Sequence, residues 1–160
     1  MGVYSSPLAR AVKTAKLVSR AEPIERDELS EIDHGDWSGL TWAQAEARWP
    51  DVVRAWQVAP HTVRMPGGES LLEVRERALG FLAWVRQRHG DGDILVVTHG
   101  TVLRLLLAHF LELGPERIWA IESESCALSV VADHDIPLIM AINDSCHLEG
   151  VRSSLDTQVR

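Results

Sequence analysis

The stretch ILVVTHGTVLR, from Ile94 to Arg104, decides the fold class of this sequence. Its first four residues are apolar without polar alternation, which is typical of a strand buried on both faces. The run stops at Thr98-His99-Gly100, and from Thr101 onward the apolar residues recur with helical spacing. We therefore predict a parallel strand that leads through His99 into a helix.

This arrangement makes His99 a candidate functional residue. Open α/β sheets bind their ligands at the carboxyl ends of the strands. The free N–H groups and the dipole of a helix N-terminus both favour anions. We expect His99 to present its imidazole to an anionic group; the competing interpretation is that it only hydrogen-bonds the backbone at the strand end.

The composition is that of one globular domain. The chain has 160 residues, of which 46% are hydrophobic and 24% charged, enough for a single core. Its net charge of −7 argues against general binding to nucleic acid or to an acidic membrane surface. The two cysteines, Cys126 and Cys146, have no metal-type spacing, and neither a signal peptide nor a membrane-spanning stretch is recognised. We therefore expect a cytoplasmic location.

Apolar spacing and capping signals predict the helices. Apolar residues at intervals of three and four predict an amphipathic helix over residues 8–20, for which Ser5 or Ser6 would supply the cap. Two capping boxes, each a hydroxyl residue followed three positions later by Gln or Glu, predict further helix starts. They lie at Thr41–Gln44 and Ser70–Glu73, and the second begins a long helix that ends near Gly90.

Strands are predicted at Val3-Tyr4, where the end of a strand meets the first helix, and later at residues 125–131 and 138–142. We expect a domain of residues 1–149. Residues 150–160 carry no strong pattern and are predicted to form a flexible tail.

Arg10 is a second candidate functional residue. It lies in the first turn of the helix predicted over residues 8–20, where a cation opposes the helix dipole. An arginine placed there to bind a phosphate would explain this choice, and a plain surface arginine is the alternative.

Five segments in order resemble the histidine phosphatase superfamily, the phosphoglycerate mutase-like enzymes, and in particular its short phosphatase branch. They are VYSSPLARAVKTA (3–15), LSEIDHGDWSG (29–39), PGGES (66–70), VVTHGTVLR (96–104) and NDSCHL (143–148). Together they span nearly all of residues 3–148. The resemblance implies a three-layer αβα fold with a mostly parallel sheet, from which the family's first β-α unit is missing.

The resemblance also implies roles for individual residues. Arg10 would clamp the transferring phosphoryl group, His99 would donate hydrogen bonds to its equatorial oxygens, and Glu31 would protonate the leaving alkoxide and later activate water. The residues expected to bind substrate are Gly100, Thr101, Ser6 and Glu69. For Glu69 there is an alternative role, which is to orient an arginine. No metal and no cofactor is implied.

The family's nucleophile is a histidine in an Arg-His-Gly segment that ends the N-terminal strand. Here Arg88-His89-Gly90 spells the tripeptide, but at the end of a predicted helix, where Gly90 suits a C-cap and His89 suits the dipole. Three explanations are open: the sequence begins at an internal methionine, the product is truncated and inert, or a second chain supplies the strand. We favour the first. His34, three residues after Glu31, is a candidate substitute nucleophile or a pocket residue.

The sequence therefore predicts a metal-independent phosphomonoesterase that acts, in the complete family enzyme, through a phosphohistidine. One alternative is a catalytically inactive phosphate-binding or interaction module. Another is a phosphoglycerate mutase-type phosphotransferase, which is disfavoured because the mutase insertion between the segments of Glu31 and Pro66 is lacking. We expect a small phosphorylated substrate, no nucleic acid and no membrane, and we leave a homodimer open. The residues expected to shape specificity are Trp37, Trp42, Trp56 and the loop 59–68.

Overall fold

The computed structural model describes residues 1–149 and has the expected α/β architecture. Within these residues, three parallel strands form one sheet in the order β2-β1-β3, so that β1 lies in the centre and pairs with both neighbours. Two further strands, β4 and β5, form a separate antiparallel pair. The strands are β1 (Gly2–Ser5), β2 (Ile24–Glu25), β3 (Ile94–Val97), β4 (Leu128–Ala132) and β5 (Leu138–Asp144).

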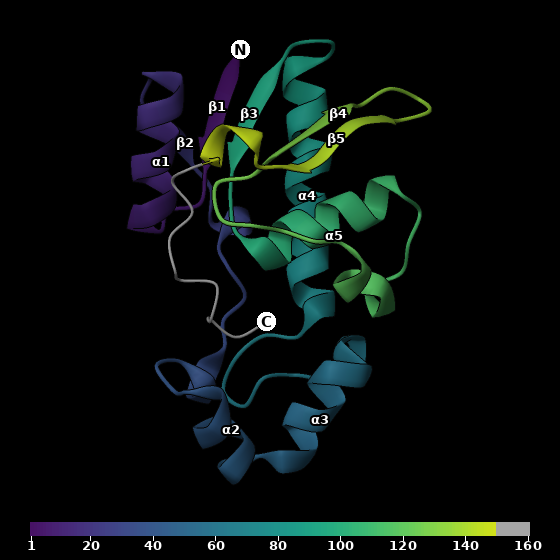
Figure 1. The fold of residues 1–160 in the computed structure, drawn as a ribbon. Coiled ribbons are helices and arrows are strands. Elements are labelled where there is room, and N and C mark those ends of the chain that lie inside the picture. The colour runs from purple at the N-terminus through teal and green to yellow at the C-terminus, as the bar shows by residue number, and fades with distance from the viewer. Residues whose placement is uncertain (150–160) are drawn as a thin grey trace.

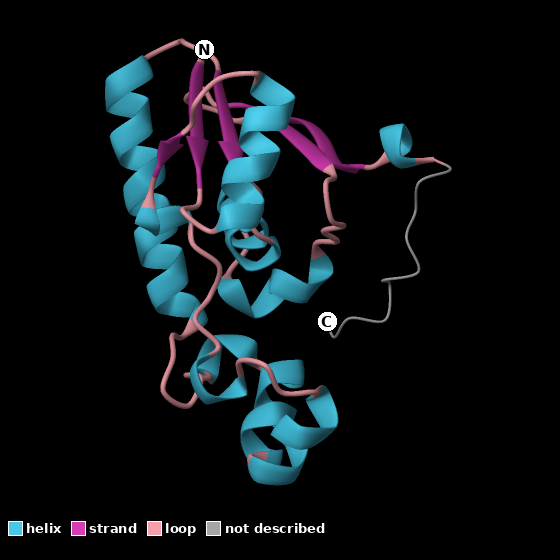
Figure 2. Cartoon of the chain, turned by 90° about the vertical axis from the view of Figure 1, so that its left-hand side faces the viewer, coloured by secondary structure: helices cyan, strands magenta, loops and turns pink. Residues whose placement is uncertain are grey.

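Helices lie on both sides of the strands, which gives the expected three layers (Figure 2). Helix α1 connects β1 to β2, α4 leads into β3, and α5 follows β3 and packs against α4. Helices α2 and α3 lie below the sheet in Figure 1. The bounds are α1 (Ala9–Ser19), α2 (Trp42–Arg48), α3 (Pro50–Val58), α4 (Leu71–His89) and α5 (Gly100–Phe110).

The capping signals are confirmed for two helices and wrong for one. Thr41 with Gln44 begins α2, and Ser70 with Glu73 begins α4, each with both reciprocal hydrogen bonds. The N-cap of α1 is instead Leu8, without a side-chain cap. The buried hydroxyl of Ser6 accepts the backbone N–H of Leu8 at 3.2 Å and faces His99, so it is engaged at the end of the sheet.

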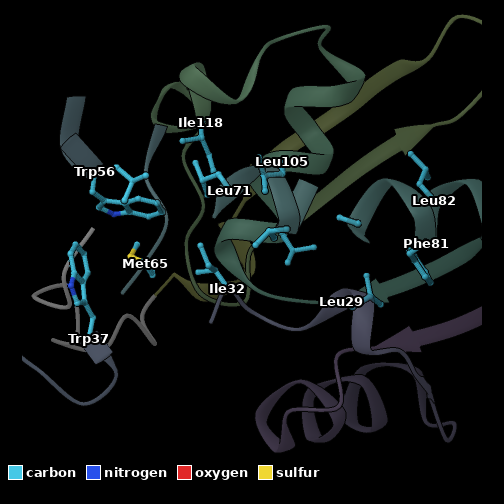
Figure 3. Packing of buried hydrophobic residues seen from close by; sticks show 14 of the residues in the cluster. Leu29, Ile32, Trp37, Trp56, Met65, Leu71, Phe81, Leu82, Leu105 and Ile118 are labelled. Carbon is cyan, nitrogen blue, oxygen red and sulfur yellow. The ribbon is translucent and has the colours of Figure 1, made fainter. Parts of the chain in front are cut away.

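One hydrophobic cluster ties the sheet to the lower helices. Helix α4 contributes a buried face that runs from Leu71 to Val85. Trp37 and Trp56 continue the same cluster beyond the sheet, on either side of Met65 (Figure 3). Leu29 and Ile32 belong to this cluster too, so the loop that follows residue 29 is packed into the same core as the sheet.

Strand β3 is less buried than expected. The sequence predicts a strand covered on both faces, but all four residues of Ile94–Val97 are half-buried. Among residues 1–149, β3 pairs with β1 on one edge and has no ladder to β4 on the other. A parallel strand is covered when it has neighbours on both edges and helices on both faces, so the open edge explains the exposure.

The predicted tail, residues 150–160, lies outside the described residues. Within the described part, none of the helices combines the length and the apolar character needed to cross a membrane.

Candidate active site

His99 lies between the end of β3 and the start of α5, and it is the N-cap residue of that helix. Its Nε2 is 2.8 Å from the Oγ of Ser6, which directly follows β1. Strands β1 and β3 are parallel neighbours in register, with Ser5 beside Val97. Both residues therefore come to the carboxyl end of the sheet, as the sequence predicts for His99.

Glu31 reaches the same place from a segment without regular secondary structure. Its Oε1 accepts the N–H of Ile32 at 2.9 Å, and its Oε2 lies 3.5 Å from the backbone nitrogen of Thr101 in the first turn of α5. The hydroxyl of Thr98 donates to the carbonyl of Leu29 at 2.7 Å, which fastens this segment to the end of β3. The Glu31 carboxylate is thus placed beside His99.

The charges that act on the pKa of His99 include that of Arg10. Burial lowers the pKa of His99, the carboxylate of Glu31 opposes this effect, and the guanidinium groups of Arg10 and Arg77 lower the pKa further. All three charges therefore act on the imidazole. Arg10 is exposed in the first turn of α1, and within residues 1–149 its guanidinium has no hydrogen-bond partner. The donors of this guanidinium are therefore accessible to a ligand from solvent.

The first turn of α5 adds backbone donors. The side chain of its N-cap residue, His99, does not cap the helix, and the first turn contains no acidic residue. Gly100 and Thr101 begin the helix directly after His99, so their N–H groups lie at the positive end of the helix dipole. A helix N-terminus, an imidazole and an arginine are groups that can each donate hydrogen bonds to a tetrahedral oxyanion.

Ser6 and Glu69, expected to bind substrate, contact other residues of the site in this structure. Ser6 is fully buried and bonded to His99. The Glu69 carboxylate accepts the Nε and Nη2 of Arg77 at 2.9 and 3.0 Å, and the backbone N–H of Asp33 at 2.9 Å. These contacts match the alternative interpretation that Glu69 orients an arginine.

Arg77 was not singled out from the sequence, although a signal was available. It lies on α4 directly before Ala78, on the border of the helix face that buries Val74, Ala78 and Phe81. A charged residue at the edge of a buried stripe needs a partner. The sequence does not say which partner it has.

The tripeptide Arg88-His89-Gly90 ends α4, as predicted. Gly90 is the C-cap residue with φ of 53°, and the Nε2 of His89 lies 2.6 Å from the hydroxyl of Tyr4. The His89 ring lies against Gly2, where β1 begins, because a Cβ on Gly2 would be 2.6 Å from its Cε1. His99 lies at the other end of β1, so His89 does not belong to the site.

The remaining candidates are placed as follows. Trp37 and Trp56 are buried in the core, and Trp42 packs edge-to-face on Trp37 with ring centroids 6.1 Å apart. His34 is half-buried at the start of the turn that holds Trp37. In the part of the chain that the structure describes, no three His, Cys, Asp or Glu side chains are grouped as metal ligands.

The fold and the site together define an α/β protein whose candidate functional residues lie at the carboxyl end of a parallel sheet. The chain belongs to the histidine phosphatase superfamily (branch 1), whose family model matches residues 1–144. It is 35% identical over 150 residues to phosphoserine phosphatase 1 of Hydrogenobacter thermophilus, a match that covers 91% of this chain and 71% of that protein.

Solved structures agree with this assignment. Bacillus stearothermophilus YhfR superposes with a TM-score of 0.85 at 29% identity, covering 92% of this chain and 75% of that one. The mycobacterial glucosyl-3-phosphoglycerate phosphatase Rv2419c, in its complex with VO3, gives a TM-score of 0.76 at 29% identity, covering 91% and 76% of the two chains. The expectation of family and fold class is confirmed.

Proposed function

We propose that this protein is a phosphomonoesterase that transfers the phosphoryl group of a small substrate to water. The observation that carries the proposal is that His99 and Glu31 meet at the N-terminus of α5, where the charge of Arg10 also acts on His99. The planar fork of Arg10 suits two phosphate oxygens at once, which the single ammonium of a lysine does not reproduce. His99 and the N–H groups of Gly100 and Thr101 would donate to the remaining oxygens.

The lowered pKa of His99 fits this role. Burial lowers the pKa of His99 and so favours the neutral imidazole in the absence of a ligand. A phosphate dianion beside it would raise the pKa and favour the imidazolium, which donates from both nitrogens. Positive charge would then develop where the transition state spreads negative charge over the equatorial oxygens.

Glu31 would act as the acid and base of the reaction. In the family mechanism a histidine attacks phosphorus, the P–O bond to the substrate breaks, and Glu31 gives its proton to the leaving alkoxide. Water then attacks the phosphohistidine, Glu31 takes the proton of that water, and phosphate leaves. We propose that the nucleophilic histidine ends a strand at the open edge of β3, because such a strand would end beside His99.

The test is hydrolysis by the full chain in the presence of EDTA. Phosphate release from p-nitrophenyl phosphate and from O-phosphoserine is compared for the wild type, Arg10→Lys and His99→Gln. Matched controls are Arg20→Lys, at the other end of α1, and His109→Gln, at the other end of α5. Hydrolysis that both site variants abolish and both controls retain supports the proposal; hydrolysis that neither site variant changes overturns it. Transfer of the phosphoryl group to phosphoglycerate rather than to water would mean a mutase.

A phosphate-binding module without turnover is the second candidate. It is favoured by the position of Arg88-His89-Gly90, which ends a helix at the wrong end of β1. Binding of inorganic phosphate without hydrolysis by the chain as written would support it. If an N-terminal extension bearing a strand and Arg-His-Gly then restored hydrolysis, the phosphomonoesterase proposal would stand and the inactive module would be excluded.

A further inference from the structure

Glu31 lies in a part of the chain that secondary structure does not hold. Residues 31–34 run between the short turns η1 (Asp27–Leu29) and η2 (Gly35–Trp37) without helix or strand. A proton donor has to be held within a fraction of an ångström of its working position to be effective. Another part of the molecule therefore has to fix this segment.

The guanidinium of Arg77 reaches the segment from α4. Its Nη1 donates to the carbonyl of Glu28 at 2.7 Å, and its Nη2 lies 3.4 Å from the carbonyl oxygen of Glu31 itself. The first carbonyl lies within η1 and the second belongs to Glu31. One planar group thus holds the backbone before and at the proposed acid.

Glu69 holds Arg77 in turn. Its carboxylate makes two parallel hydrogen bonds with the guanidinium and accepts the backbone N–H of Asp33. Both side chains of this ion pair are mostly buried, with 19% of Arg77 and 27% of Glu69 exposed. Fork-to-fork pairs of this kind fix direction as well as distance. We call Arg77, Glu69 and the segment 28–33 that they hold the brace.

Backbone contacts between residues 33–36 and residues 66–69 support the brace. Glu69 donates its N–H to the carbonyl of Asp33 at 2.9 Å, and Asp36 donates to the carbonyl of Pro66 at 2.8 Å. Gly35 and Gly68 allow this approach, because a Cβ at either position would overlap the facing backbone. The segments around residues 33 and 68 therefore pack main chain against main chain.

From these contacts we infer that Arg77 is a positioning residue for Glu31, and that Glu69 is the anchor that orients Arg77. The inference rests on the proposed function, in which Glu31 is the acid. Its experiment includes a measurement that needs no turnover, so the failure of one is told apart from the failure of the other.

The measurement is an NMR titration of the His99 ring in the full chain, where the Glu31 carboxylate raises the pKa. Glu31→Gln removes that carboxylate and lowers the pKa of His99. Arg77→Lys keeps a positive charge near His99 but loses the fork, so we expect the pKa to fall in the same direction as Glu31 moves away. Glu69→Gln should act likewise. Arg75→Lys, two residues earlier on α4, is the control and leaves the pKa unchanged.

The double variant Glu31→Gln/Arg77→Lys decides the outcome. If Arg77 acts through Glu31, adding Arg77→Lys to Glu31→Gln shifts the His99 pKa no further. A wild-type pKa in Arg77→Lys overturns the inference. So does a shift of equal size with and without Glu31, and so does an unshifted pKa in Glu31→Gln. Thermal unfolding of each variant confirms that it is folded at the temperature of the titration.

If the chain hydrolyses phosphate esters, the rate of hydrolysis gives a second readout. An alkyl phosphate needs a proton on its leaving oxygen, whereas a p-nitrophenolate scarcely does. For the alkyl substrate, Glu31→Gln and Arg77→Lys should each lower kcat/KM by about 10²-fold, with a smaller loss for the aryl substrate. Equal losses on both substrates would indicate general damage to the site and overturn the inference.

Discussion

Replacement of Gly68 by alanine tests how the segment that carries Glu31, the proposed acid, is held in place. A Cβ at this position would overlap the carbonyl oxygen of Asp33 and lie 2.7 Å from the nitrogen of Gly35 and 3.0 Å from the carbonyl carbon of Asp33. These atoms belong to packed backbone, which cannot move aside for the added Cβ as the end of a flexible side chain could. The two segments have to separate, and the hydrogen bonds from Glu69 to Asp33 and from Asp36 to Pro66 are then lost or lengthened.

The magnitude follows from those bonds. Two backbone hydrogen bonds, each contributing about 0.5–1.5 kcal/mol, give a destabilisation of about 1–3 kcal/mol. Urea unfolding followed by tryptophan fluorescence measures it as a lower midpoint with unchanged slope. The matched control is Gly80→Ala in α4, where an added Cβ meets nothing within 4 Å. At that exposed helical position, alanine should raise the free energy of unfolding by about 1 kcal/mol.

The same substitution distinguishes the proposed role of Glu31 as the acid from the proposed binding of the anion. Arg10, His99 and the start of α5 do not belong to the brace, so vanadate affinity of Gly68→Ala should stay close to that of the wild type. Turnover of an alkyl phosphate should fall by about 10²-fold if the segment of Glu31 moves by about 1 Å. An unfolding free energy within about 0.5 kcal/mol of the wild type, with turnover unchanged, would refute the reasoning.

Three further predictions concern the surroundings of the site. Tyr4→Phe removes the hydrogen bond to His89 and should lower the free energy of unfolding by about 0.5–1.5 kcal/mol; an unchanged urea midpoint would contradict it. Thr98→Val leaves the carbonyl of Leu29 unpaired and should cost about 1–3 kcal/mol, again by urea unfolding, whereas a cost near zero would mean that water replaces the hydroxyl. Because the folded-state pKa of His99 is lowered from its usual 6.5, its contribution to stability is complete above pH 6.5 and is lost as the pH falls through the folded pKa. Urea midpoints measured from pH 8 to pH 5 should therefore fall less steeply in His99→Gln than in the wild type, and equal slopes would contradict this.

Local signals in the sequence were sufficient for much of the fold. The unbroken apolar run before His99 and the helical spacing after it predict β3 and α5 correctly, because both depend on neighbours a few residues away. The two capping boxes at Thr41 and Ser70 are confirmed for the same reason. The unfavourable position of Arg10 against the helix dipole marked a residue whose charge acts on His99 in the structure.

Long-range contacts could not be obtained in this way. Arg77 lies 49 residues from Glu28, whose carbonyl it holds, and no local pattern names that partner. Ser6 fits a helix cap by sequence, but its contact with His99 depends on which strands are neighbours. The exposure of Ile94–Val97 likewise depends on the occupancy of a sheet edge, which the apolar run alone does not reveal.

Calorimetric titration of orthovanadate into the full chain tests the central claim most directly, namely that Arg10, His99 and the start of α5 bind one oxyanion. Loss of a hydrogen bond to a charged group, of about 1.5–3 kcal/mol, corresponds to a roughly 10- to 150-fold weaker Kd. We expect that loss in Arg10→Lys and His99→Gln, and the wild-type Kd in Arg20→Lys and His109→Gln. Vanadate that binds equally to all five proteins, or to none of them, would contradict the account.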